Sequence, residues 1–521
     1  MVCMKHGRVA ALAMLLAFLG AARARADRPL SLNEAIRMAL EKNSDLVIER
    51  ESVTAATANV SGAQGAYDPV LHLNGGWSRS QEPVNSVFSG APLGHLGPEV
   101  EITQAGGGIR QYLPTGGSLD LTADGLKQTT DGTLFLLSPA YGTHVGLALR
   151  QPLLRDRAVD DIRLRQRVAR ADEGAAMASL RRSATNTVAA VERAYWRLVA
   201  AGQGLAVRED AVRLAEQQLA ETQSRIQTGA LPSTDLSQPR AELERRRGEL
   251  LADRETAARA QSALKLLILD DADAARWLEP LTPTDSASVA PESVDPAGAL
   301  EQALAGRPEL DEARAALEVR RAETARAKSG AGPSLDAVMS YDRFGLTGTP
   351  NPNAFAGFPP SAEPGGSGLG DAISGLSDGT THAARVAVEL GLPITNRTAR
   401  SAVATAQSAE RQAEASLLQE RKAICAEVLD AAAAFGTAAQ RVAAARAARE
   451  AAQTQLDAER DRFESGRSTN FLVLTRQNDL SRARLDEISA RTDYQNARTD
   501  LAVATGALAQ VHGTEVTVPG H

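Results

Sequence analysis

The side chains that could carry out chemistry are few and widely separated. Six histidines follow residue 26, at His72, His95, His144, His382, His512 and His521. No metal-ligand spacing, nucleophile elbow or phosphate-binding loop is present. Gly106-Gly-Gly108 lacks the following helix that a nucleotide-binding loop requires. The sequence therefore predicts no enzyme, no cofactor and no metal site.

The start of the chain has the pattern of a signal peptide spanning 1–26. Lys5 and Arg8 precede an apolar run from Val9 to Ala22, and Ala24-Arg25-Ala26 fits a cleavage site. The alternative, a membrane anchor, is disfavoured because the run is short for spanning a bilayer. No later stretch has 18 consecutive apolar residues, so no transmembrane helix is expected.

Cleavage there leaves one cysteine and an acidic chain. Cys425 has no partner for an intrachain disulfide, and we interpret it as a small buried residue of a helix. The mature chain has 53 basic and 64 acidic residues, a net charge of −11. This balance disfavours nucleic acid as a partner.

The elements that must position any functional residue are long helices with a seven-residue period. The first seam comprises Val191, Leu198, Leu205, Val212, Leu219 and Ile226. It stops near Gly229 and resumes as Leu236, Leu243, Leu250, Ala257 and Leu264. This period is typical of a coiled coil, so we predict a helical hairpin over about 152–269 with its turn at 229–235.

The hairpin occurs twice, at an offset of 237 residues. The second seam comprises Val428, Phe435, Val442, Arg449, Leu456 and Phe463, and it returns as Val473, Leu480, Glu487, Tyr494 and Leu501. Only Arg449 and Glu487 break the apolar match. We therefore predict an internal duplication, with a second hairpin over about 393–508 and its turn at 466–472.

The duplication extends to the opening helices. Ser31-Leu-Asn-Glu34 is a capping box, and the stretch 39–46 aligns with 303–310 at offset 264. We predict repeat 1 over 27–270, a linker over 271–294, repeat 2 over 295–510 and a C-terminal tail over 511–521. Four prolines (Pro69, Pro152, Pro333 and Pro393) mark the expected helix–strand switches.

Between these prolines the period changes to two, which predicts strands at about 70–150 and 334–391. Leu71, Leu73 and Trp77 alternate with polar residues, for example, and Val386, Val388 and Leu390 do the same. Repeat 1 is longer here because of an extra hairpin near 99–126, around Pro114-Thr-Gly-Gly117. We favour an extracellular extension for this hairpin over two added barrel strands.

Such strands in an exported protein have two interpretations. One is a soluble antiparallel sheet with one wet face, and the other is an outer-membrane barrel, apolar toward lipid. Four to six strands cannot close a barrel alone, so several copies would have to pool strands. Aromatic residues that would form a headgroup-level belt are Trp77, Tyr112, Tyr141, Tyr341 and Phe344. The helix from about Leu153 to Gly229 would be roughly 115 Å long, which suits a tube crossing a periplasm.

The sequence resembles the TolC-like outer membrane efflux protein family over nearly the whole mature chain. The resemblance lies in the stretch Leu30–Leu46, in Gln151-Pro-Leu-Leu154, in Ala194-Tyr-Trp-Arg-Leu-Val199 and in Phe463-Glu-Ser-Gly466. It continues through Val473-Leu474, Ala483, Tyr494, Ala497, Leu501 and Gly506.

This resemblance implies a mainly α fold with a transmembrane β portion. Long hairpins would form a periplasmic α-barrel in a homotrimer, and the strands a shared outer-membrane β-barrel of a Gram-negative bacterium. It implies a passive exit duct of a tripartite efflux or type I secretion system. The duct would dock a periplasmic adaptor and, through it, an inner-membrane RND, ABC or MFS pump.

The resemblance places a gate at the hairpin tips. Thr234 and Asp235 match the family's Thr-Asp, but the usual Tyr is Phe463 and the usual Arg falls on Ser468, beside Arg467. Ring aspartates of some members fall on Leu472 and Thr475, so Leu472 either forms an apolar constriction or packs in the coiled coil. Adaptor-docking candidates are Gly229, Ala230, Leu231, Ser465, Gly466 and Arg467.

Two other classes of protein remain open from the residues alone. A periplasmic adaptor has a long hairpin but would carry one copy between soluble β-domains. A structural coiled-coil protein would not need the amphipathic strands. The cargo, the pump class and the cognate adaptor cannot be read from the sequence.

Overall fold

The computed structural model describes residues 28–86, 88–270, 274–290, 294–355, 366–378 and 380–508. The predicted signal peptide and the predicted C-terminal tail lie outside the described residues. The chain divides into two compact units. One holds residues up to Ala55, Gly174–Arg314 and from Ser416 onward, and the other holds Ala56–Glu173 and Ala315–Ala415. Each unit takes segments from both predicted repeats.

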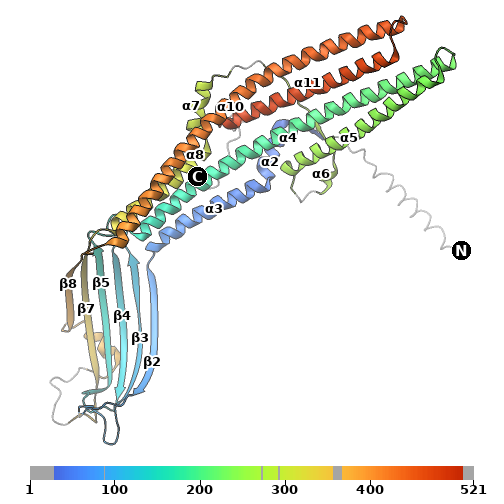
Figure 1. Ribbon diagram of the computed structural model, residues 1–521. Helices are drawn as coiled ribbons and strands as arrows, with labels where there is room; N and C mark the ends of the chain where they lie inside the picture. The colour runs from blue at the N-terminus through green and yellow to red at the C-terminus, as the bar shows by residue number, and fades with distance from the viewer. Residues whose placement is uncertain are drawn as a thin grey trace, which may run out of the picture. The chain divides into compact units, whose positions relative to one another are not determined.

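Both repeats have two opening helices, continue into strands and end in a long helical hairpin (Figure 1). They differ in the strand section, where repeat 1 has four long strands and repeat 2 has two with a short helix between them. Repeat 1 contains β1 (Arg28–Leu30), α2 (Leu32–Lys42), α3 (Ser44–Gln64), η1 (Gly65–Tyr67), β2 (Val70–Gln81), β3 (Glu99–Tyr112), β4 (Ser118–Thr130), β5 (Leu137–Pro152), α4 (Asp161–Gln227), η2 (Ser233–Leu236) and α5 (Ser237–Ile268). After α6 (Ala274–Leu278) and β6 (Leu281–Pro283), repeat 2 contains α7 (Pro296–Gly306), α8 (Pro308–Gly330), β7 (Ser334–Pro350), α9 (Leu369–Gly375), β8 (His382–Gly391), α10 (Arg397–Glu464) and α11 (Asn470–Ala504).

The long helices start later than the prolines predict. Pro152 is the last residue of β5, and α4 begins at Asp161, where the Asp160 carboxylate accepts a hydrogen bond from the Arg163 amide at 2.7 Å. Pro393 likewise precedes α10 by several residues. A side-chain cap, rather than proline, therefore starts α4. With 67 residues α4 is about 100 Å long, shorter than expected.

The seam of the second hairpin is buried as predicted, and its two exceptions explain each other. Val428, Phe435 and Leu456 are buried in the seam of α10. Arg449 on α10 forms an ion pair with Glu487 on α11, whose carboxylate also pairs with Arg491. The charged residues at both mismatched positions thus satisfy each other across the hairpin.

The core of the first unit surrounds the end of the first hairpin away from its turn. Leu30, Ile36, Leu198 and Leu264 belong to one buried cluster contributed by β1, α2, α4 and α5. β1 pairs in parallel with β6 of the inter-repeat segment, so the start of repeat 1 and the linker are joined here. None of the helices in the described part of the chain combines the length and apolar content needed to cross a membrane.

The second unit contains a six-stranded antiparallel sheet in the order β2-β3-β4-β5-β7-β8 (Figure 1). The extra hairpin is part of this sheet: β3 pairs with β2, and β4 with β5, along nearly their whole lengths. The preference for an extracellular extension was therefore wrong. The alternation of apolar and polar residues in this hairpin could not show that it joins the sheet. A hairpin that projects from a sheet and a hairpin inserted into it have the same period of two.

The register of the sheet separates an apolar from a polar face. One row across the apolar face is Leu71, Ile109, Leu121, Leu147 and Tyr341. Within the single chain this face is largely uncovered, since Leu73 is 78% exposed and Val386 80%.

The opposite face carries cross-strand ion pairs. Arg110 pairs with Asp120, and Arg150 donates a hydrogen bond to Asp336 at 2.6 Å. His144 lies 3.0 Å from Asp342 on the neighbouring strand. A sheet with one exposed apolar face and one charged face fits the predicted membrane strands.

Helix α9 packs on one end of the apolar face through a glycine contact. A Cβ atom on Gly345 would lie 2.0 Å from the Ala372 carbonyl oxygen and 2.6 Å from Thr143 Oγ1. Thr143 donates a hydrogen bond to that same carbonyl at 2.9 Å. Only glycine leaves room for the helix backbone here.

Gly345→Val should therefore displace α9 from the sheet. The added side chain cannot fit without moving helix backbone, and overpacking of this kind costs about 1–3 kcal/mol. Hydrogen exchange of residues 366–378 should become markedly faster. Gly370→Ala is the matched control, because a Cβ atom at Gly370 meets nothing within 4 Å. Unchanged exchange in the valine variant would contradict this account.

Candidate functional site at the hairpin tips

The two hairpin turns are built identically, although they lie 237 residues apart. Gly229 and Gly466 have φ of 77° and 72°. The amide of Ala230 donates to the Arg225 carbonyl at 2.8 Å, and Arg467 donates to Arg462 at 2.8 Å. Each glycine amide also bonds three residues back. This is the Schellman motif, which ends a helix with a residue in the left-handed region and favours glycine there.

The predicted docking residues are accessible at these turns. Gly229, Ala230, Ser465, Gly466 and Arg467 are exposed, and Leu231 is half-buried. A Cβ atom at either glycine would meet nothing within 4 Å. The turns therefore present mostly backbone and short side chains to the surroundings.

The gate candidates of the first turn contact each other. Thr234 and Asp235 belong to the short helix η2, where Thr234 Oγ1 lies 3.4 Å from an Asp235 carboxylate oxygen. In the second turn, Ser468 bonds to Glu459, a carboxylate only 7% exposed. Arg467 reaches only Ser465 of its own turn, at 3.2 Å. Among the described residues, both side chains bond within the second hairpin and neither bonds to the first.

Phe463 does connect the two hairpins, through a residue that sequence reasoning missed. The Arg225 guanidinium carbon lies 4.7 Å from the centre of the Phe463 ring. A cation over an aromatic face is attracted by about 0.5–1 kcal/mol at an exposed site. Arg225 lies in the last turn of α4, so its charge also suits the helix end. The sequence signal that could have identified Arg225 is its position one helical turn before Gly229.

Leu472 does not pack in the seam of its own chain. It is 40% exposed, whereas its neighbours Val473 and Leu474 are 3% and 5% exposed. Within one chain, packing in the coiled coil therefore does not account for Leu472. Thr475 bonds its own helix, donating to the Phe471 carbonyl at 2.9 Å.

A groove of 240 Å³ separates the returning helices α5 and α11 next to these residues. It is lined by Gln238, Ala241, Glu242, Arg245, Phe471, Leu474, Thr475 and Asn478. Its polar side leads directly into a network of charged side chains, which we call the arginine lock and define as Arg208, Glu242, Arg245, Arg246, Glu249, Asp253 and Asn478.

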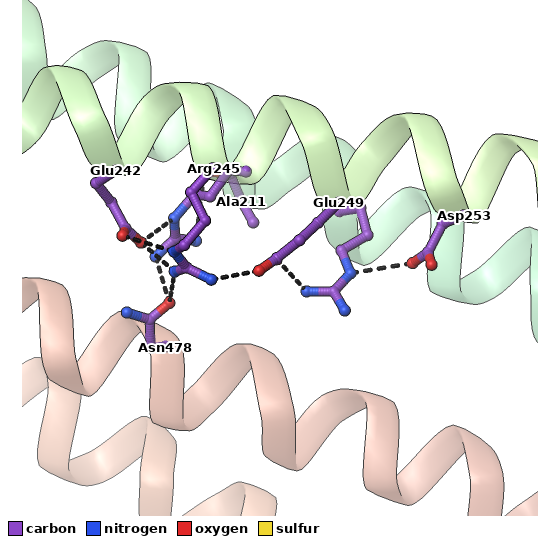
Figure 2. A network of polar contacts seen from close by, with 8 residues as sticks. Ala211, Glu242, Arg245, Glu249, Asp253 and Asn478 are labelled. Carbon is purple, nitrogen blue, oxygen red and sulfur yellow. Dashed lines mark hydrogen bonds and ion pairs between the residues drawn. The ribbon is translucent and has the colours of Figure 1, made fainter.

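The arginine lock connects the first hairpin to the second (Figure 2). Arg246 and Arg245 donate hydrogen bonds to the side-chain oxygen of Asn478 at 2.9 Å and 3.0 Å. Both arginines also donate to Glu242, at 2.8 Å and 2.6 Å. Two guanidinium groups of α5 therefore converge on one amide oxygen of α11, near the shared carboxylate.

The lock extends back to the outgoing helix of the first hairpin. Arg208 on α4 donates to Glu249 at 2.7 Å and to Asp253 at 3.0 Å, and Arg245 also contacts Glu249. Arg246 is only 2% exposed, so its charge depends on these partners. Polar coupling thus runs from α4 through α5 to α11.

The electrostatics of Glu242 predict how this lock responds to pH. Burial would raise the pKa of Glu242, but hydrogen bonds from Arg245 and Arg246 outweigh it and lower the pKa below 4.5. Its stabilising contribution is therefore complete above pH 4.5 and is lost as the pH falls through the folded value. Spin labels at residues 230 and 467 should keep their distance from pH 8 to 5.5 and separate only in stronger acid. Separation already at pH 6 would contradict the assignment.

The aromatic residues proposed as a belt divide between the two faces. Trp77 and Tyr141 lie in one row of the apolar face, connected through Thr103 and Lys127. Tyr341 is on that face but six residues before Thr347, the partner of Tyr141 on β7.

Phe344 is on the polar face, where its ring stacks on His144 at 5.1 Å, and Tyr112 shares that face by alternation. Phe344 and Tyr112 therefore do not lie on the face predicted to meet lipid, because clustering in sequence does not show which side of the pleat a residue takes. A belt role stays a prediction for Trp77, Tyr141 and Tyr341.

Residues 299–507 match the family described as outer membrane efflux protein. This match covers 209 of the 521 residues, all of them in the second repeat. The match confirms the resemblance to the TolC-like family, and the predicted outer-membrane location agrees with the description of this family. No curated protein matches the chain.

Solved structures share the fold of both repeats. A membrane protein from Pseudomonas aeruginosa aligns at 22% identity with a TM-score of 0.62, covering 91% of this chain and 93% of that one. The CmeC outer membrane channel of Campylobacter jejuni aligns at 16% identity and a TM-score of 0.63, covering 91% and 85%. The open state of the MtrE outer membrane channel of Neisseria gonorrhoeae aligns at 17% identity with a TM-score of 0.60, covering 94% of this chain and 91% of that one. These similarities establish the fold, and they indicate no enzyme family.

Proposed function

We propose that this efflux protein is the exit duct of a tripartite efflux or type I secretion system. Three copies would pool their strands into one barrel in the outer membrane, and their hairpins would form a periplasmic tunnel. Cargo would pass through this duct passively, driven by an inner-membrane RND, ABC or MFS pump. The duct itself needs no catalytic residue.

The uncovered apolar face of the sheet carries this proposal. Leu71, Leu147 and Tyr341 share a row on that face, and Leu73 and Val386 are about four-fifths exposed. A soluble sheet would bury such a face, whereas lipid accepts it. The charged opposite face suits a water-filled lumen.

The proposal is tested by fractionation combined with native mass spectrometry. We expect the mature protein to stay in the outer membrane after high-salt and carbonate washes, and to be trimeric in detergent. A periplasmic adaptor or a soluble coiled-coil protein would be released by the washes. A monomer that is soluble without detergent would refute the duct.

The exposed turns are the proposed docking surface for the adaptor. A photo-crosslinking residue at Ala230 or at Ser465, which lie on the two turns, should capture a periplasmic partner in cells. The same residue placed on the apolar sheet face at Leu73 is the control, and it should capture no such partner. The captured protein would also reveal the pump class.

The tip is the proposed gate. Thr234 and Thr469 begin the returning legs of the two hairpins, so a disulfide between cysteines there should hold the tip closed. Conductance in a planar bilayer should fall on oxidation and recover on reduction. Leu472, exposed beside the groove, is the proposed apolar constriction between copies.

A further inference from the structure

The sheet ends in two strands that each have an unpaired side. β2 pairs only with β3, and β8 pairs only with β7, among the residues that the structure describes. In lipid, backbone amides and carbonyls must find partners, so an open edge cannot persist there. All six long strands in the described part of the chain are already in the sheet, so we look for the missing partner in another chain.

The register of the sheet restricts how two copies can join. One row of the polar face can be followed through Val70, Arg110, Asp120, Ala148, Ser340 and Arg385. β8 has 10 residues and β2 has 12, so β8 can lie wholly against β2 in few antiparallel registers. These place Arg385 opposite Gly76, Trp77 or Ser78 of the next copy.

The alternation of side chains between the two faces excludes the register that pairs Arg385 with Trp77. Pairing Arg385 with Trp77 would put the polar face of one copy beside the apolar face of the next, because a shift of one residue reverses every side chain. Gly76 and Ser78 both lie on the polar face with Arg385. The row that begins at Val70 of one copy therefore reaches Gly76 or Ser78 of the next copy. This is a shift along β2 of six or eight residues per copy.

Either advance gives a closed barrel of ordinary geometry. Over six strands spaced about 4.8 Å apart, with about 3.3 Å per residue, the strands would tilt by roughly 35° or 42°. Closed barrels have tilts of about 35–45°. The strand lengths were not chosen to satisfy this relation, so the agreement is an independent sign that the two edges fit each other.

We propose that β8 of each copy pairs with β2 of the next, so that three copies close a barrel of 18 strands. This inference rests on the proposed function for the number of copies. Repeat 1 supplies four strands per copy and repeat 2 supplies two, so the sheet does not share the twofold repetition of the helices.

The inserted hairpin β3–β4 then widens the barrel. Eighteen tilted strands give a diameter between backbones of roughly 35 Å, compared with roughly 24 Å for four strands per copy. Barrels of 16–18 strands leave an aqueous channel. The strand section would thus admit large hydrated cargo, such as a polypeptide or a glycan chain. The hairpin tips would then be the part of the duct that limits the size of the cargo.

Paired cysteines test the junction between copies. In a Cys425→Ala background, we expect either Gly76→Cys with Arg385→Cys, or Ser78→Cys with Arg385→Cys, to give disulfide-linked trimers after oxidation. Opposed strand residues lie close enough for a disulfide. Ser80→Cys with Glu389→Cys, which is out of register by about six or eight residues in the two allowed registers, should give none. Each single-cysteine variant controls for random collisions.

A second pair tests the strand count. Ser78 and Ile102 are register partners on β2 and β3, so cysteines there should form a disulfide within one chain. Its absence would mean that the hairpin stands outside the barrel, and it would overturn the count of 18. Trimers that crosslink at neither junction pair would overturn the edge pairing alone, while monomers would overturn the proposed function. Disulfide-linked dimers without trimers would mean that two copies, with 12 strands in total, close the barrel.

Discussion

Asn478→Leu should open the periplasmic tip and raise the open probability of the channel by at least about tenfold. The substitution removes the only acceptor on α11 in the arginine lock, toward which Arg245 and Arg246 converge at 3.0 Å and 2.9 Å. Hydrogen bonds to charged groups contribute about 1.5–3 kcal/mol each. The Arg245 side chain is 47% exposed, so solvent screening reduces its share. A net loss of about 1.4 kcal/mol per copy already corresponds to tenfold.

Asn478→Asp is the matched control, because it keeps an acceptor and adds a negative charge between two guanidinium groups. The carboxylate turns both contacts from charged-to-neutral hydrogen bonds into ion pairs with Arg245 and Arg246, so this variant should stay closed more firmly than the wild type. Single-channel recordings in planar bilayers measure both variants. Equal open probabilities for the leucine and aspartate variants would show that the lock does not hold the gate.

Arg307→Met should destabilise the protein more than substitution of the equivalent residue in repeat 1. Arg307 is 7% exposed at the end of α7. It donates to Glu309 at 2.9 Å and to Glu427 of α10 at 3.0 Å. It also donates to the carbonyls of Val503 and Ala504, at 3.3 Å and 3.2 Å, where α11 ends. One guanidinium group thus joins three helices.

Removing that group leaves two carboxylates and two carbonyls without their donor. Burial alone would lower the pKa of Arg307, but Glu427 and Glu309 outweigh it and raise the pKa, so the charge persists at all accessible pH values. Breaking a buried pair costs about 3–5 kcal/mol, and partial exposure of Glu427 reduces this to about 2–3 kcal/mol. The apparent Tm in detergent should fall by roughly 2–5 °C.

The equivalent position in repeat 1 provides the control. Asn43, offset by 264 residues, also follows an opening helix, and its side chain donates to the Leu267 carbonyl near the end of α5 at 3.3 Å. It makes the same kind of contact without a charge, and its side-chain oxygen also accepts a hydrogen bond from the Asp45 amide at 3.0 Å. Asn43→Leu should therefore cost about 1–2 kcal/mol, less than Arg307→Met. A larger loss for Asn43→Leu than for Arg307→Met would contradict the role assigned to the guanidinium group.

Much of the architecture follows from local patterns in the sequence. The heptad seams predicted both hairpins, and the glycines at 229 and 466 predicted their turns, because a seven-residue period and a left-handed residue are local requirements of the backbone. Arg449 and Glu487 looked like two unrelated defects of the second seam. Only the folded hairpin brings them together as an ion pair.

The candidate site was predicted less completely than the fold. Sequence reasoning located the tip and Phe463, but it missed Arg225 above that ring and the whole arginine lock. Arg245, Arg246 and Asn478 stand in ordinary charged helix stretches more than 230 residues apart. Their convergence depends on the rotation of α5 against α11, which no spacing within either helix encodes.

By itself, the sequence determined the duplication, the helical hairpins, the alternating strands and the resemblance to outer membrane efflux proteins. The tertiary structure decided that the hairpin at 99–126 enters the sheet, that Phe344 takes the polar face, and that α5 and α11 are locked together. Periodicity along a chain fixes which face of an element is apolar. Which strands become neighbours, and which helix faces meet, depends on pairing between distant segments.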